Sequence, residues 1–114
     1  MTLDEFLSTL DMHPDRVEFS DSMLVIDANY LFTPVEFFIG DVHNKVGENS
    51  GSCKIFAFAQ LQGLSVEQTL SCFGQYYRLD VLNNPNSDNH ANIRTFMKQG
   101  WAGIRFSQIP LIAI

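Results

Sequence analysis

The 114-residue sequence is poor in basic side chains and has no long apolar run. Lys and Arg number 7 against 13 Asp and Glu, and the resulting net charge of −6 opposes binding to a phosphate backbone or an anionic membrane. No stretch approaches the ~18 consecutive apolar residues of a membrane span, and residues 1–5 lack the positive start of a signal peptide. We therefore expect no nucleic-acid partner, no membrane partner and a cytoplasmic location.

The sequence also lacks linkers, repeats and metal-ligand motifs. No Pro/Ser/Gly-rich stretch divides the chain, and 46% hydrophobic residues, including 10 Phe, supply one core. A single domain over residues 1–114 is therefore expected. No His, Cys, Asp and Glu set has the spacing of a structural metal site, so we expect no metal and no cofactor.

The pattern of apolar residues predicts an α+β fold that is predominantly helical. Thr2 and Glu5 form a capping-box pattern, and Ser20 is expected to cap the second helix. Residues 23–26 within that helix are equally compatible with a buried strand. The predicted elements are helices over 3–12, 20–29, 52–62, 65–82 and 88–99, strands over 35–39 and 104–106, a loop over 40–51 and a turn over 83–87.

The helix over 52–62 is apolar around most of its circumference, which is typical of a helix that runs through the core. It is expected to form a central helical hairpin with the following helix, while the strand over 104–106 lies beside that over 35–39 in a small β element. In such a hairpin Cys53 and Cys72 are offset by about one helical turn, beyond the reach of a disulfide.

Several motifs are unusual in combination. The longest is Gly-Ser-Cys-Lys-Ile-Phe-Ala-Phe-Ala-Gln-Leu over 51–61; others are Asn-Tyr-x-Phe-Thr-Pro over 29–34, Tyr-Tyr-Arg over 76–78, Asn-Ile-Arg over 92–94 and Gly-Trp over 100–101. Across residues 17–106 the chain resembles the HopJ type III effector family. The resemblance implies a bacterial protein whose relatives are thought to be delivered into host cells, with no established enzymatic activity to carry over. Besides the cytoplasmic location expected above, the resemblance implies secretion into a host cell by a type III system.

Cys53 is the candidate nucleophile. It follows Gly51 and Ser52 at the predicted start of a helix, where the helix dipole favours a thiolate. The segment is locally similar to the nucleophile helix of papain-type proteases, with His90 downstream and Asp88 or Asn92 as an orienting group. The alternative is a small buried cysteine, since apolar packing should raise the thiol pKa more than the dipole lowers it.

A second group of polar residues predicts a binding surface beside the core. Its alternative interpretation is a hydrogen-bonded network that fixes the C-terminal helix onto the hairpin. The candidate binding residues are Tyr76, Arg78, Asp88, His90, Asn92 and Arg94.

Two loops carry weak metal-like patterns. Asp41, His43 and Glu48 are widely spaced in a predicted loop that we expect to be solvated. Residues 84–88 begin like a calcium loop, but the sixth position is Asn89 and the twelfth is Thr95.

Three functions remain open from the sequence. The first is a non-enzymatic module that binds a host protein, a bacterial protein or a small ligand through the candidate surface. The second is a hydrolase or transferase that uses Cys53 and His90, and the third is a purely structural protein.

Overall fold

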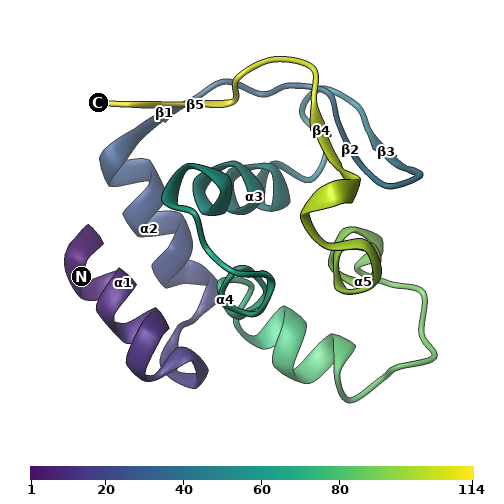
Figure 1. Ribbon diagram of the computed structural model, residues 1–114, viewed down its shortest axis with the longest axis horizontal. Coiled ribbons are helices and arrows are strands. Elements are labelled where there is room, and N and C mark those ends of the chain that lie inside the picture. The colour runs from purple at the N-terminus through teal and green to yellow at the C-terminus, as the bar shows by residue number, and fades with distance from the viewer.

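The computed structural model describes residues 1–114 and confirms a mainly helical α+β fold (Figure 1). The α-helices are α1 (Leu3–Met12), α2 (Phe19–Asn29), α3 (Ser50–Gln62), α4 (Val66–Ser71) and α5 (Ala91–Gln99). Short 3-10 helices are η1 (Pro14–Arg16) and η3 (Gly100–Gly103), and η2 (Tyr76–Val81) is a π-helix. The strands are β1 (Tyr30–Phe32), β2 (Phe37–Ile39), β3 (Val42–Asn44), β4 (Ile104–Phe106) and β5 (Leu111–Ala113). None of the helices combines the length and apolarity that a bilayer span requires.

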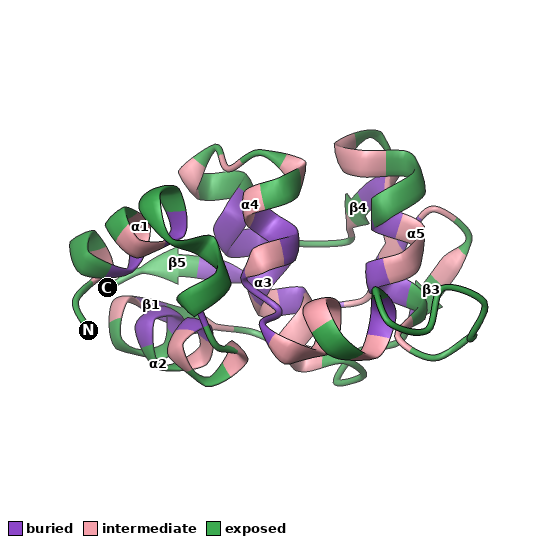
Figure 2. Cartoon of the chain, turned by 90° about the horizontal axis from the view of Figure 1, so that it is seen from below, coloured by how far each residue is buried: buried purple, intermediate pink, exposed green.

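Helix α3 occupies the centre of the molecule, with the other helices around it (Figures 1 and 2). The Phe56 ring packs on Phe73 and Phe96 at centroid distances of 5.3 and 4.9 Å, and Phe58 contacts Phe6 of α1 edge to face at 5.9 Å. These rings belong to one cluster of 22 buried residues. The prediction of a largely apolar helix that runs through the core is therefore confirmed.

The strands form two small antiparallel sheets, one of β1 and β5 and one in the order β3-β2-β4. Phe32 of β1 pairs with Leu111 of β5, and five residues further Phe37 of β2 pairs with Phe106 of β4 in the same antiparallel register. The ladder is interrupted between these pairs, where Pro34 and Pro110 lack the backbone N–H that a ladder needs. The predicted pairing of 104–106 with 35–39 is confirmed, while the pairing of β1 with β5 was not predicted.

Two predictions for the N-terminal half differ from the structure. Thr2 and Glu5 do form the capping box of α1, but Glu18 with Asp21, and not Ser20, caps α2. The expected loop over 40–51 is wrong, because it contains β3, which pairs with β2 in a tight hairpin through Gly40.

The prediction of one continuous helix over 65–82 is wrong, because the structure has two shorter helices there. Helix α4 begins at the expected capping box of Ser65 and Gln68 but ends at Ser71, and η2 follows after a turn. Gly74 lies in that turn with φ of +57°, and its α-carbon faces the backbone of Phe19 so closely that an added Cβ would lie 2.5 Å from the Phe19 nitrogen. The break lets the start of α2 pack directly against the main chain of this turn.

The last helix begins later than predicted. Asp88 is exposed and caps nothing, and the N-cap of α5 is His90. Cys53 and Cys72 are both free and buried, as the offset of the hairpin predicts.

Candidate functional site

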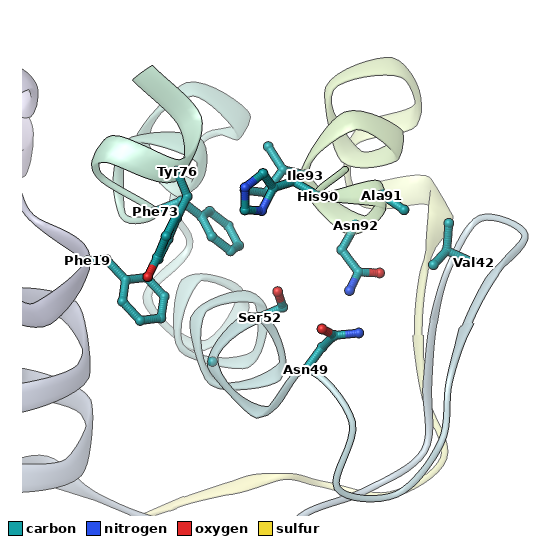
Figure 3. A pocket seen from close by; sticks show the side chains of 11 residues that line it. Phe19, Val42, Asn49, Ser52, Phe73, Tyr76, His90, Ala91, Asn92 and Ile93 are labelled. Atoms are coloured by element: carbon teal, nitrogen blue, oxygen red, sulfur yellow. The ribbon is translucent and has the colours of Figure 1, made fainter. Parts of the chain in front are cut away.

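A cavity of about 320 Å³ lies where the first turns of α3 and α5 approach each other (Figure 3). One wall comes from the start of α2 and the turn before η2, and the opposite wall comes from β3 and α5. The lining residues are Phe19, Val42, Asn49, Gly51, Ser52, Phe73, Tyr76, His90, Ala91, Asn92 and Ile93.

The residues that precede α3 and α5 at the cavity share the same unusual backbone conformation. The N-caps Asn49 and His90 have φ of 50° and 54°, and they are the two residues other than glycine with positive φ. Neither side chain caps its helix, and the first intrahelical hydrogen bonds run from Cys53 N to Asn49 O and from Arg94 N to His90 O. The first three N–H groups of each helix therefore lack an intrahelical acceptor and carry the positive end of the helix dipole.

The apolar wall is built from aromatic rings. Tyr76 contacts Phe19 edge to face at a centroid distance of 5.0 Å and the His90 ring at 5.4 Å. Gly51 makes room for this wall, since a Cβ at that position would lie 2.7 Å from the tip of the Phe19 ring. Any side chain at residue 51 would therefore displace the Phe19 ring from its present position.

The polar side of the cavity is held by three asparagines. Asn44 and Asn92 exchange hydrogen bonds through their side-chain amides at 3.0 and 2.9 Å, and both residues are buried. Asn49 donates a third bond of 2.7 Å to the Asn44 oxygen. This network ties β3 and the starts of α3 and α5 together, so it fixes the shape of the cavity.

Ser52 contributes a hydroxyl to the middle of this space. It is the third residue of α3, and in Figure 3 its oxygen points toward the cavity between Asn49 and Asn92. His90 stands at the rim, where its Nε2 lies 3.0 Å from Asp80 Oδ2 and its side chain is about one quarter exposed. Ser52 thus faces the cavity as an uncommitted donor, whereas the imidazole already has a partner.

The neighbouring Cys53 is on a different face of α3, because successive residues of a helix are turned by about 100° from each other. Its side chain is buried, it does not line the cavity, and burial raises the pKa of its thiol to about 11 despite a backbone hydrogen bond from Val35. Burial is thus the dominant influence on the pKa of this thiol. No hydrogen bond joins Cys53 to His90, whose ring is paired with Asp80.

The six candidate binding residues divide into two groups. Tyr76, His90 and Asn92 come together in the cavity. Arg78 instead donates to the backbone oxygens of Val17 and Pro14 at 2.8 and 3.4 Å, and so it joins η2 to the segment between α1 and α2.

Asp88 and Arg94 lie apart from the cavity lining. Arg94 donates to the backbone and side-chain oxygens of Asn89 at 2.6 and 2.8 Å, which braces the turn before α5. Asp88 is exposed in that turn. Neither arginine contact joins the C-terminal helix to the hairpin as the network interpretation expected. Of the six candidates, His90 makes such a contact, through Asp80 of η2.

The residues with a metal-like pattern do not converge. His43 pairs with Glu36 at 2.6 Å, and Glu48 accepts a hydrogen bond from the Lys45 N–H at 2.7 Å. No group of three His, Cys, Asp or Glu side chains in the structure could hold a metal ion.

Sequence reasoning did not identify four of the lining residues that matter most: Phe19, Asn49, Gly51 and Ser52. The Gly-Ser-Cys motif drew attention to its cysteine, while the structure directs the serine into the cavity. The error came from the predicted start of the helix. Because α3 begins at Ser50, two residues earlier than predicted, Ser52 lies in its first turn.

Comparisons with known proteins identify the family to which the chain is similar. The family model described as HopJ type III effector protein matches residues 3–111. No curated protein shows a significant match to the chain. The crystal structure of the unknown function protein VPA0580 is similar over 100% of this chain and 95% of that chain, with 49% identity and a TM-score of 0.97.

Proposed function

The chain belongs to the HopJ type III effector family, and we propose that it is a non-enzymatic binding module whose small ligand occupies the cavity between α3 and α5. The observation that carries the proposal is the lining of this cavity, in which aromatic rings face a set of hydrogen-bond donors. Its volume of about 320 Å³ falls in the range of small-molecule sites, which are mostly apolar with a few convergent polar groups. As a type III effector, the protein would carry out this binding inside a host cell.

The lining indicates the chemistry of the ligand. Phe19 and Tyr76, packed edge to face, form an aromatic wall, which suits contact with an aromatic group. Opposite it are the Ser52 hydroxyl and the first-turn N–H groups of α3 and α5, which donate hydrogen bonds. No Asp or Glu lines the cavity, although the protein has 13 of them. We therefore expect a compact aromatic compound that carries a carboxylate or a phosphate.

The cysteine-dependent alternative gains no support from the arrangement of these groups. A nucleophilic thiol needs a low pKa and a base within hydrogen-bond reach. The pKa of Cys53 is raised to about 11, and its thiol makes no hydrogen bond to the candidate base His90, whose Nε2 is bonded to Asp80. Binding without covalent chemistry accounts for the cavity more simply.

The proposal can be tested by calorimetric titration with phenyl phosphate and benzoate. Benzyl alcohol and inorganic phosphate serve as half-ligand controls, since each offers only one of the two expected groups. We expect phenyl phosphate or benzoate to bind at least tenfold more tightly than either half-ligand, a difference of about 1.4 kcal/mol.

A substitution inside the cavity provides a second test of ligand binding. Ser52→Leu places an aliphatic side chain in the space and removes the hydroxyl, so binding should be lost. Ser8→Leu makes the same chemical change on an exposed position of α1 and should leave binding unchanged. Equal binding by the two variants, or no binding of any probe to the wild type, would contradict the proposal.

A further inference from the structure

The imidazole of His90 has one ring nitrogen outside the cavity and one that faces it. Its Nε2 lies 3.0 Å from Oδ2 of Asp80, a residue of η2 that does not line the cavity. Its Nδ1 makes no hydrogen bond within the protein. In Figure 3 this second nitrogen lies on the cavity side of the ring, toward Ser52. His90 therefore keeps one hydrogen-bonding atom free for a ligand.

The pairing with Asp80 determines which nitrogen of the neutral ring carries the proton. A carboxylate accepts a hydrogen bond, so the proton of the neutral imidazole lies on Nε2. Nδ1 then presents a lone pair to the cavity and can only accept a hydrogen bond. When the ring takes up a second proton, Nδ1 becomes a donor, and the pair of His90 and Asp80 loses its net negative charge. One proton thus reverses both the hydrogen-bonding role and the charge at this rim.

No other side chain in the lining can supply a full positive charge. The cavity is lined by no Lys or Arg, and α2, α3 and β3 contribute uncharged residues to it. The second titratable group of the lining is the Tyr76 phenol, which is neutral when protonated. Beside His90 along the chain, Asp88 is exposed, and Arg94 is bonded into the turn before α5. Asp80 is therefore the one charged group that bonds to the imidazole.

We propose that His90 is a ligand-binding residue that makes binding of an anion by the cavity depend on pH, which rests on the function proposed above. The anion binds together with one proton from water. That proton adds to Nδ1, and the resulting N–H donates a charge-assisted hydrogen bond to an oxygen of the anion. When the ligand leaves, the proton returns to water. Imidazole ordinarily changes its charge between pH 5 and 8, so binding strengthens over this range as the pH falls.

Calorimetric titration with benzoate at pH 6 and pH 8 tests the proposal. Benzoate stays ionised over this range, whereas a phosphate monoester itself takes up a proton near pH 6. Any pH dependence of benzoate binding therefore comes from the protein. We expect the wild type to bind benzoate roughly threefold or more tightly at pH 6 than at pH 8.

Two asparagine variants identify the histidine responsible. His90→Asn removes the titratable ring, and asparagine tolerates the left-handed conformation of residue 90, where φ is 54°. It should bind benzoate equally at both pH values. His43→Asn is the matched control, because His43 also pairs with a carboxylate, that of Glu36 at 2.6 Å, but is exposed and does not line the cavity. It should retain the pH dependence of the wild type.

Circular dichroism at both pH values establishes that each variant is folded. Equal binding of benzoate by the wild type at pH 6 and pH 8, or a pH dependence that His90→Asn retains, would overturn this proposal and leave the binding function of the cavity intact. Failure of both benzoate and phenyl phosphate to bind at either pH would instead overturn the proposed function and the role of His90 with it.

Discussion

Replacing Gly74 by alanine should be among the most destabilising single-methyl additions in this protein. Two independent costs combine at this position. The backbone has φ of +57°, which costs an alanine about 1 to 2 kcal/mol relative to glycine. The added Cβ would also lie 2.5 Å from the backbone nitrogen of Phe19 and 3.0 Å from the carbonyl carbon of Glu18.

These neighbours are main-chain atoms at the start of α2, so they cannot move aside as a flexible side chain would. Overpacking of this kind costs typically about 1 to 3 kcal/mol, and the sum is about 2 to 5 kcal/mol. That is a large part of a total stability of about 5 to 15 kcal/mol. A shift of α2 to relieve the clash would move Phe19 and so also alter the aromatic wall of the cavity.

Gly63→Ala provides the control that separates the two costs. Gly63 has a similar φ of +66°, but an added Cβ would meet nothing within 4 Å. Urea denaturation should therefore show a loss of about 1 to 2 kcal/mol for Gly63→Ala, which is the backbone term alone, and a clearly larger loss for Gly74→Ala. Equal losses would refute the argument that the close approach of Gly74 to α2 is what requires glycine.

Three further predictions concern the buried polar groups and thiols. Cys53 and Cys72 should react slowly with iodoacetamide at neutral pH, because burial raises the pKa of their thiols to about 11 and about 12; rapid labelling of either by mass spectrometry would contradict this. Since both folded pKa values exceed the ordinary value of 9.0, the stability that the neutral thiols confer should be complete below pH 9 and decline as the pH rises through 11 and 12. Urea denaturation should show a smaller alkaline decline in Cys53→Ala than in the wild type. Asn44→Ala and Asn92→Ala should each cost about 1 to 3 kcal/mol by leaving a buried amide unpaired, and the double variant should cost less than the sum; strict additivity would show that the two amides do not interact.

The helices whose ends are determined locally could be predicted from the sequence. The capping boxes of Thr2 with Glu5 and of Ser65 with Gln68 are satisfied within four residues of chain, so their signal is complete in the sequence. Gly63 likewise ends α3 in the left-handed conformation that glycine favours.

The parts that were missed depend on contacts between distant segments. Strand β5 is an apolar run without alternation, and only its pairing with β1, some 80 residues earlier in the chain, makes it a strand. Helix α4 stops because the main chain of Gly74 meets that of Phe19, although a glycine inside a helical pattern was a usable warning.

The cavity was predicted only in part for the same reason. Tyr76, His90 and Asn92 were found from the sequence because polar and aromatic residues gather there. The left-handed N-caps could not be predicted, because Asn and His adopt that conformation only where the surrounding structure requires it. The role of Ser52 in the cavity could not be predicted either, because it depends on where α3 begins.

The central claim is that the first turns of α3 and α5 form a binding site, and amide chemical shifts measure this most directly. A titration of the ¹⁵N-labelled protein with phenyl phosphate, followed by two-dimensional NMR, should shift the amide signals of Gly51, Ser52, Asn92 and Ile93 first and most strongly. These signals report on the N–H groups that lack an intrahelical acceptor. Shifts confined to residues 104–111, or no shifts at millimolar phenyl phosphate, would contradict the account.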